Sequence, residues 1–169
     1  MIAFTTRHVA ASGVMAALVC VTTLLITFPI PATQGFFNIG DVMIMVAALT
    51  FGPLVGGIAG GIGSSLADMI GGWYSYAPFT LVIKGIEGLL AGFILSKSRS
   101  KRLPVIIVAW VVGGTEMVLG YFTAQAFILG YGIAGAVAEI PFNIVQAAVG
   151  GILGIPISLA LRTRIRLDR

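Results

Sequence analysis

Long apolar runs with very few charged residues between them dominate this sequence. Only 9% of the 169 residues are charged, against about 25% in an ordinary soluble domain. Sixteen charged side chains cannot cover the surface of a water-soluble protein of this size. The sequence therefore excludes a soluble globular fold and predicts an integral membrane protein whose surface is mostly in contact with lipid.

Six apolar segments, delimited by glycine, proline and polar connections, predict six membrane-spanning helices. A spanning helix needs about 20 apolar residues, so the chain has room for roughly five to seven helices and no soluble domain. Gly52-Pro53 predicts a tight turn between the second and third helices, because proline breaks a helix. We therefore expect a compact all-α bundle that forms one membrane domain, 1–169, with helices at about 8–28, 40–52, 54–71, 78–96, 104–125 and 139–161.

The basic residues support this number of helices. Nine of the ten lie near the amino terminus, in the connection 97–102 or in the carboxy-terminal tail. Six helices place these three regions on one side of the membrane, as the positive-inside rule requires, whereas five or seven do not. We therefore expect both termini and the 97–102 connection in the cytoplasm, and residues 29–38, 72–77 and 126–138 outside.

A cleaved signal peptide is the alternative interpretation of the first segment, because Pro31-Ala32-Thr33 follows its apolar run. The run from Val9 to Phe28 is about 20 residues long, however, and the apolar region of a signal peptide has about 7 to 15. Cleavage would also leave five helices and lose the agreement with the charge distribution. A retained helix is therefore favoured.

Small residues recur at four-residue spacing in the third segment, as in Gly56/Gly60, Gly57/Gly61 and Gly60/Ser64. Such spacing lets helix backbones approach closely, and close packing drives helix association in lipid. We therefore expect the third helix to lie in the centre of the bundle.

Polar residues within the apolar segments predict a pocket in the outer half of the bundle, since each buried charge costs about 2.5–3.5 kcal/mol at the centre of a membrane helix. Glu139, Asn143 and Gln146 fall on one face of the sixth segment, and Glu116 and Tyr121 lie on the fifth. With residues of the outer connections and the fourth segment, the candidate substrate-binding residues are Asn38, Trp73, Tyr76, Lys84, Glu116, Tyr121, Glu139, Asn143 and Gln146.

The other buried acidic residues have structural explanations. Asp41 is placed to cap the second helix. Asp68, near the end of the third, needs a partner such as Lys84 or nearby backbone amides, and Glu87 can pair with Lys84 three residues earlier. We interpret Asp41, Asp68 and Glu87 as structural polar residues.

The outer connections are rich in aromatic side chains, Phe36-Phe37 in the first and Trp73-Tyr74-Ser75-Tyr76 in the second. They fit an interfacial aromatic belt. They also fit a set of stacking surfaces over an outward-facing pocket, and both interpretations remain open at this point.

No residue pattern supports catalysis, a metal or a cofactor. The chain has one cysteine, one histidine, no phosphate-binding loop and no arrangement of nucleophile and base. We therefore predict no enzyme activity, and ATP hydrolysis must come from a partner. The net charge of +4 marks the cytoplasmic side of a membrane protein, and no nucleic-acid partner is predicted.

Four motifs occur in order in the middle of the chain. They are Phe37-Asn38-Ile39-Gly40-Asp41, Phe51-Gly52-Pro53-Leu54, Gly63-Ser64-Ser65-Leu66-Ala67-Asp68 and Tyr76-Ala77-Pro78-Phe79-Thr80-Leu81-Val82-Ile83-Lys84-Gly85. Their order and spacing resemble those of the substrate-binding S components of energy-coupling factor (ECF) vitamin transporters. Chain length, six helices and charge distribution extend the resemblance over the whole chain.

The resemblance implies a high-affinity binding subunit in the cell membrane that takes a vitamin or precursor from outside under the first outer loop. It also implies docking on a transmembrane scaffold subunit and two ATPase subunits, followed by ATP-driven toppling that delivers the substrate inward. The family's docking surface of small residues on the first helix falls here on Ser12, Gly13, Ala16 and Ala17.

The identity of the substrate is narrowed by the residue types of the pocket. Aromatic rings with neutral amides suit a flat polar ring such as a hydroxymethylpyrimidine or a pyridoxine-like compound, with riboflavin next. A small membrane scaffold or assembly protein that transports nothing is the alternative function.

Overall fold

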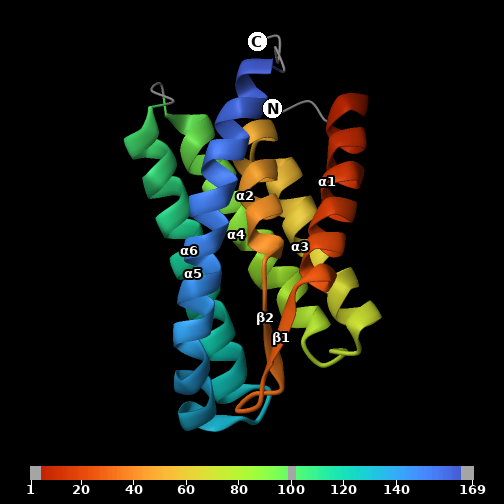
Figure 1. Cartoon of the computed structure of the whole chain (residues 1–169), viewed down its shortest axis with the longest axis vertical. Coiled ribbons are helices and arrows are strands. Elements are labelled where there is room, and N and C mark those ends of the chain that lie inside the picture. Colours follow the sequence, from red (N-terminus) through yellow and green to blue (C-terminus); the bar gives the residue numbers. More distant parts are fainter. Residues whose placement is uncertain (1–4, 99–101, 165–169) are drawn as a thin grey trace.

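Six helices and one β-hairpin make up residues 5–98 and 102–164, the part of the chain that a computed structural model describes (Figure 1). The hairpin lies between the first two helices. In chain order the elements are α1 (Thr6–Leu25), β1 (Thr27–Ile30), β2 (Gly35–Asn38), α2 (Gly40–Phe51), α3 (Pro53–Gly71), α4 (Ala77–Lys97), α5 (Leu103–Phe127) and α6 (Gly132–Arg164).

Five of these helices, all except α2, are long and apolar enough to cross a membrane. The 12 residues of α2 extend over about 18 Å, whereas the hydrocarbon core of a bilayer is about 30 Å thick. Figure 1 shows that α2 occupies only the half of the bundle nearest the chain ends, and that the hairpin occupies the other half. The hairpin therefore fills the space that a longer second helix would take.

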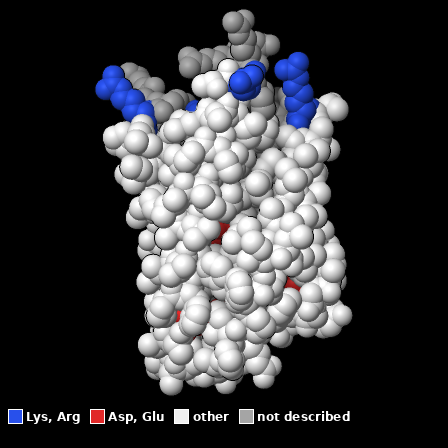
Figure 2. All heavy atoms as spheres, in the orientation of Figure 1, with Lys and Arg blue, Asp and Glu red and all other residues white. Residues whose placement is uncertain are grey.

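Two ends of the bundle differ in charge. The first turn of α1, the ends of α4 and α5 that flank their connection, and the last turn of α6 lie together at one end (Figure 1). Figure 2 shows lysine and arginine side chains gathered there and acidic side chains further along the bundle. We call this the basic end, with Arg7, Lys97, Arg102, Arg162 and Arg164, and the opposite one the hairpin end. The other predicted basic residues, Arg99, Lys101, Arg166 and Arg169, lie outside the described residues.

Residues 27–38 are not helical, although the first helix was predicted to continue to residue 28 and to be followed by an outer connection. They form two antiparallel strands, with Thr27 opposite Asn38 and Ile30 opposite Gly35. Pro29 and Pro31 lack an amide hydrogen, which disfavours a helix there, and residues 27–30 pair with β2 instead. Helix α1 ends at Leu25, three residues before the predicted end.

The sixth helix is longer than predicted. It begins at Gly132, seven residues before the predicted start, and it contains Pro141 and Pro156. Prolines are tolerated within membrane helices because neighbouring groups satisfy the freed backbone carbonyls. The outer connection between α5 and α6 is correspondingly shorter than the predicted range 126–138.

Glycines bring α3 into close contact with its neighbours, and it packs against α1, α2 and α4. A Cβ atom on Gly56 would lie 2.7 Å from both the Ala48 Cα and the Gly88 carbonyl oxygen, and one on Gly63 would lie 2.5 Å from the Ala16 carbonyl oxygen. Real Cβ atoms do not approach backbone so closely. The central position predicted for this helix is therefore found, and it depends on glycine.

Replacing Gly56 with alanine should lower the thermal stability of the purified protein by about 1–3 kcal/mol, because the added methyl group collides with backbone on two sides. Gly13 is the matched control, since a Cβ atom there meets no other atom within 4 Å. Thermal unfolding in detergent should show a lower Tm for Gly56→Ala and an unchanged or higher one for Gly13→Ala. Equal Tm values for the two variants would contradict the close packing.

Candidate functional site

The β-hairpin is anchored to the helices at its tip and at its base. At the tip, the Thr33 hydroxyl donates a hydrogen bond to the Glu139 carboxylate on α6, and the Thr33 carbonyl accepts one from the Tyr76 hydroxyl at 2.7 Å. At the base, the Asn38 amide donates to the Gln146 side-chain oxygen at 3.0 Å. Helix α6 therefore holds the hairpin at two points about two turns apart.

Aromatic side chains join the hairpin to the connection between α3 and α4. The rings of Phe36 and Trp73 are tilted by 35° with centroids 4.0 Å apart. Tyr76 stacks with Tyr131 at a centroid distance of 6.2 Å. These contacts pack the outer connections against one another and against the hairpin.

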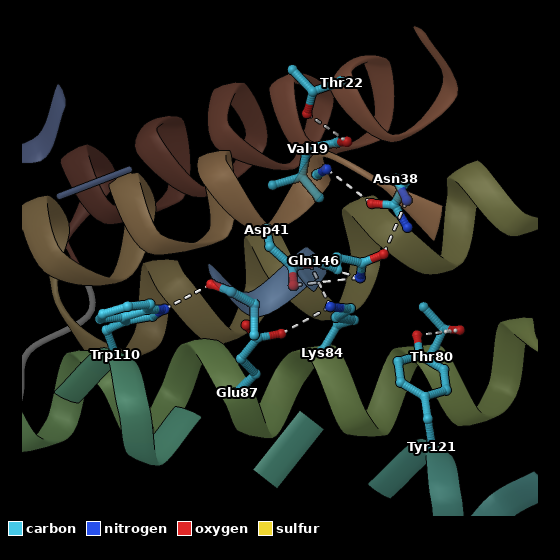
Figure 3. Close-up of polar contacts among 12 residues, drawn as sticks. Val19, Thr22, Asn38, Asp41, Thr80, Lys84, Glu87, Trp110, Tyr121 and Gln146 are labelled. Carbon is cyan, nitrogen blue, oxygen red and sulfur yellow. Dashed lines mark hydrogen bonds and ion pairs between the residues drawn. The ribbon is translucent and has the colours of Figure 1, made fainter. Parts of the chain in front are cut away.

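A buried ion-pair cluster lies at the start of α2 and joins three helices (Figure 3). The Lys84 ammonium on α4 bonds to the carboxylates of Asp41 on α2 and of Glu87, the latter at 3.1 Å. The Gln146 amide nitrogen on α6 donates to the two Asp41 oxygens at 3.3 and 3.4 Å. These four residues are each at most 2% exposed, so the cluster is buried from bulk solvent. We call Asp41, Lys84, Glu87 and Gln146 the ion-pair cluster.

Asp41 does not cap α2 as predicted. The N-cap residue is Ile39, and the Asn38 side-chain oxygen accepts a hydrogen bond from the Gly40 amide at 2.9 Å. Asp41 lies inside the first turn, where its carboxylate accepts hydrogen bonds from Lys84 and Gln146. An attraction between two full charges in apolar surroundings outweighs the modest gain from a cap. The predicted pairing of Lys84 with Glu87 is present.

A polar cavity lies between the hairpin and the ion-pair cluster. Its free volume is about 20 Å³, which is space for about one water molecule. Every helix except α2 contributes to its wall, together with β2 and the connection before α4. The lining residues are Thr23, Gly35, Phe36, Asn38, Ser64, Asp68, Tyr76, Thr80, Lys84, Tyr121, Glu139, Asn143 and Gln146.

Most of the predicted substrate-binding residues come together in this wall, from segments far apart in the sequence. The polar stripe of α6 is buried and faces the cavity over its whole length. The predicted residues in the lining are Asn38, Tyr76, Lys84, Tyr121, Glu139, Asn143 and Gln146.

Two predicted residues lie elsewhere. Trp73 is half-buried against Phe36 outside the lining. Glu116 lines an outward-facing apolar groove between α4 and α5, with Val82 and Leu119 nearby. Because Glu116 precedes Tyr121 by five residues, the two point in directions about 140° apart on the helix. The fifth segment therefore presents only one of them to the cavity.

The sequence prediction missed part of the wall. Thr23 and Ser64 are buried hydroxyl residues that line the cavity, and Thr33 anchors the hairpin tip. Asp68, interpreted as structural, lines the cavity too, and its Oδ2 has no hydrogen-bond partner. Hydroxyl residues are common in membrane helices, so only their tertiary position distinguishes these.

The small residues predicted as a docking surface divide between two faces of α1. Ser12 and Ala16 are buried against the rest of the bundle, whereas Gly13 and Ala17 are exposed. Neighbouring residues point about 100° apart on a helix, so the four cannot share one outer face. Only Gly13 and Ala17 remain available to a partner.

Replacing Lys84 with methionine should destabilise the protein by about 3–5 kcal/mol, because Asp41 and Glu87 would then be buried charges without a partner. The triple variant Asp41→Asn/Lys84→Met/Glu87→Gln removes all three charges and should regain most of the loss. Thermal unfolding in detergent measures both variants. A single variant as stable as the wild type would show that the cluster does not hold the helices together.

Comparison with known proteins gives the family of the chain. The family model described as the S component of an ECF-type riboflavin transporter matches residues 3–163. A Pyrococcus woesei protein, described as an uncharacterized protein in gap 3'region, is 52% identical over 147 residues, which cover 87% of this chain and 96% of the relative. The thiamine precursor transporter HmpT of Lactococcus lactis subsp. cremoris is 34% identical over 142 residues, 83% of this chain and 79% of that protein.

The fold agrees with this result. A solved structure of the S component of a bacterial ECF transporter matches with a TM-score of 0.73 at 22% identity, over 96% of this chain and 98% of that one. The bundle with its hairpin is therefore a known S-component fold. Since the family model also spans almost the whole chain, the protein belongs to the S components of ECF transporters.

Proposed function

We propose that this protein is the substrate-binding subunit of an ATP-driven importer in the cell membrane that takes up a vitamin or vitamin precursor. The polar cavity beneath the hairpin is the observation that carries the proposal. It lies within an otherwise apolar bundle, and its wall gathers side chains from five helices. Family membership supports the class of protein, and the cavity supplies a place for the substrate.

The lining favours a flat, polar ring. Phe36, Tyr76 and Tyr121 offer aromatic faces, and Asn143 offers an amide. Riboflavin and thiamine precursors, for which the family model and one relative are named, contain planar nitrogen heterocycles. A hydroxymethylpyrimidine or pyridoxine-like compound remains the favoured substrate, with riboflavin next.

The hairpin is proposed to act as the cap of this site. The free volume of about 20 Å³ is smaller than any such ring, so the wall must open to admit one. The hairpin is held at its tip by the hydrogen bonds of Thr33 to Glu139 and Tyr76. Breaking these few bonds moves the hairpin without disturbing the helix packing, whereas opening the wall elsewhere separates whole helices.

The hairpin end is proposed to face outside and the basic end to face the cytoplasm, with six crossings of the membrane in one domain. The described basic residues other than Lys84 support this orientation. The chain has no phosphate-binding loop, so the energy for transport comes from a transmembrane scaffold subunit with two ATPase subunits. Gly13 and Ala17, exposed on α1 toward the basic end, form the proposed docking surface for the scaffold.

Purified protein should bind one of three probes, 4-amino-5-hydroxymethyl-2-methylpyrimidine, pyridoxine or riboflavin, and ATP should not change the affinity. Asn143→Leu should weaken this binding by about 1–3 kcal/mol, because a polar group of the ligand then loses its partner. Phe142→Leu is the matched control, since Phe142 is exposed on the outer side of the same helix turn. Isothermal titration calorimetry measures all three proteins.

Failure of the wild type to bind any of the three probes would refute the proposed function. Equal affinities for the wild type and Asn143→Leu would instead place the substrate away from α6.

The double variant Gly13→Leu/Ala17→Leu should bind the probe normally but lose contact with the scaffold subunit. Large side chains at these positions prevent close helix approach, while the cavity lies on the other side of α1. The control pair Ala134→Leu/Ala138→Leu adds the same bulk at exposed positions on α6. Co-purification with the scaffold and ATPase subunits, and ATP-dependent uptake, should fall only in the first variant. Wild-type uptake by that variant would move the docking surface elsewhere.

A further inference from the structure

The wall of the cavity formed by α1 and α3 carries polar atoms that nothing in the protein satisfies. Asp68 and Thr23 are each 2% exposed. Asp68 Oδ2 and Thr23 Oγ1 both lack a hydrogen-bond partner. Both residues line the cavity. A buried polar atom without a partner costs about 1–3 kcal/mol, and more when it is charged. An acidic side chain left in this state needs an explanation.

The donors in the lining do not bond to Asp68 Oδ2. The Lys84 ammonium directs two of its three hydrogens to Asp41 and Glu87. The Thr80 hydroxyl accepts a hydrogen bond from Tyr121 at 3.0 Å (Figure 3) and does not bond to Asp68 Oδ2. That oxygen is left for a group that enters the cavity.

The charges around the cavity select the kind of group. Asp68 and Glu139 are acidic lining residues, and the one basic lining residue, Lys84, is neutralised by carboxylates behind the wall. Among the described residues the cavity therefore has an excess of acidic groups. Such surroundings repel a carboxylate or phosphate and attract a nitrogen that carries hydrogens.

We propose that Asp68 and Thr23 form a specificity-determining subsite that receives an amino group attached to the ring of the substrate. An amino group has two hydrogens to donate, and the subsite has two unpartnered oxygens, Asp68 Oδ2 and Thr23 Oγ1. The substrate class is then an amino-substituted heterocycle without a carboxylate or phosphate. This inference rests on the proposed function and deepens it, because it names the group that the same cavity recognises.

A matched pair of probes tests the subsite. 4-Amino-5-hydroxymethyl-2-methylpyrimidine and its 4-hydroxy analogue differ only where the amino group is replaced by oxygen. Calorimetry on the purified full-length protein should give at least tenfold tighter binding of the amino compound, because the analogue, which exists mainly as the pyrimidinone, brings a carbonyl oxygen with no hydrogen to donate to the Asp68 carboxylate. A site built to bind an N–H group rejects analogues that lack it.

Variants then assign this preference to residues. Asp68→Asn should weaken binding of the amino compound at least tenfold and abolish the preference over the hydroxy analogue, and Thr23→Val should change both in the same direction by a smaller factor. Thr50→Val is the control for Thr23→Val, because the Thr50 hydroxyl bonds to Ser158 at 3.0 Å outside the cavity lining. It should leave the preference unchanged.

Thermal stability without ligand gives a second readout. Because Asp68→Asn removes an unpartnered buried carboxylate, its Tm should equal or exceed that of the wild type. A markedly lower Tm would show that Asp68 is a structural residue and would overturn the subsite. Two measurements test the proposal even if Asp68→Asn does not fold. They are the preference of the wild type for the amino compound over the hydroxy analogue, and the change of this preference in Thr23→Val.

The outcomes separate the two proposals. If the protein binds none of the probes (the two pyrimidines, pyridoxine and riboflavin), the proposed function itself is refuted. Binding of riboflavin or pyridoxine without the aminopyrimidine, equal binding of the two pyrimidines, or an unchanged preference in Asp68→Asn overturns the subsite and leaves the proposed function standing.

Discussion

The attraction between Lys84 and two carboxylates within the apolar bundle is the interaction on which the rest of the structure depends. A single charge in such surroundings is too costly to remain unpaired, so Asp41 on α2 and Glu87 on α4 must lie beside it. Gln146 extends the cluster to α6 and also bonds to the last residue of β2. One cluster thus sets the spacing of three helices and the position of the hairpin.

The cavity exists because the second helix is short. Helix α2 begins at mid-height in the bundle, and the hairpin fills the remaining half (Figure 1). A hairpin is held by a few side-chain hydrogen bonds, such as that of Thr33 to Glu139, whereas a helix would be held by a continuous packed surface. Because a hairpin takes the place of a longer helix, polar side chains face a space that can open. The helix bundle beside that space stays packed.

Polar groups around the cavity differ in how completely they are paired. Those at the ion-pair cluster bond mainly to one another and stabilise the fold, with Glu87 Oε1 as their one unpartnered oxygen among the described residues. Asp68 and Thr23, on the opposite wall, retain unpartnered oxygens in a buried position. Natural proteins tolerate such destabilising groups at functional sites, where ligand binding offsets the unfavourable free energy. Among the described residues with unpartnered buried atoms, Asp68 and Thr23 are the two that line the cavity and are therefore available to a substrate.

The sequence by itself determined the membrane class, the apolar segments and the polar stripe on α6, because spacing along one helix reports which residues share a face. It did not determine how each helix is rotated against its neighbours. For that reason Glu116 proved to face outward, Ser12 and Ala16 proved to be buried, and Asp68 proved to line the cavity. The hairpin, too, emerged only from the tertiary structure, since Thr33 and Asn38 find their partners on α6, more than 100 residues away in the chain.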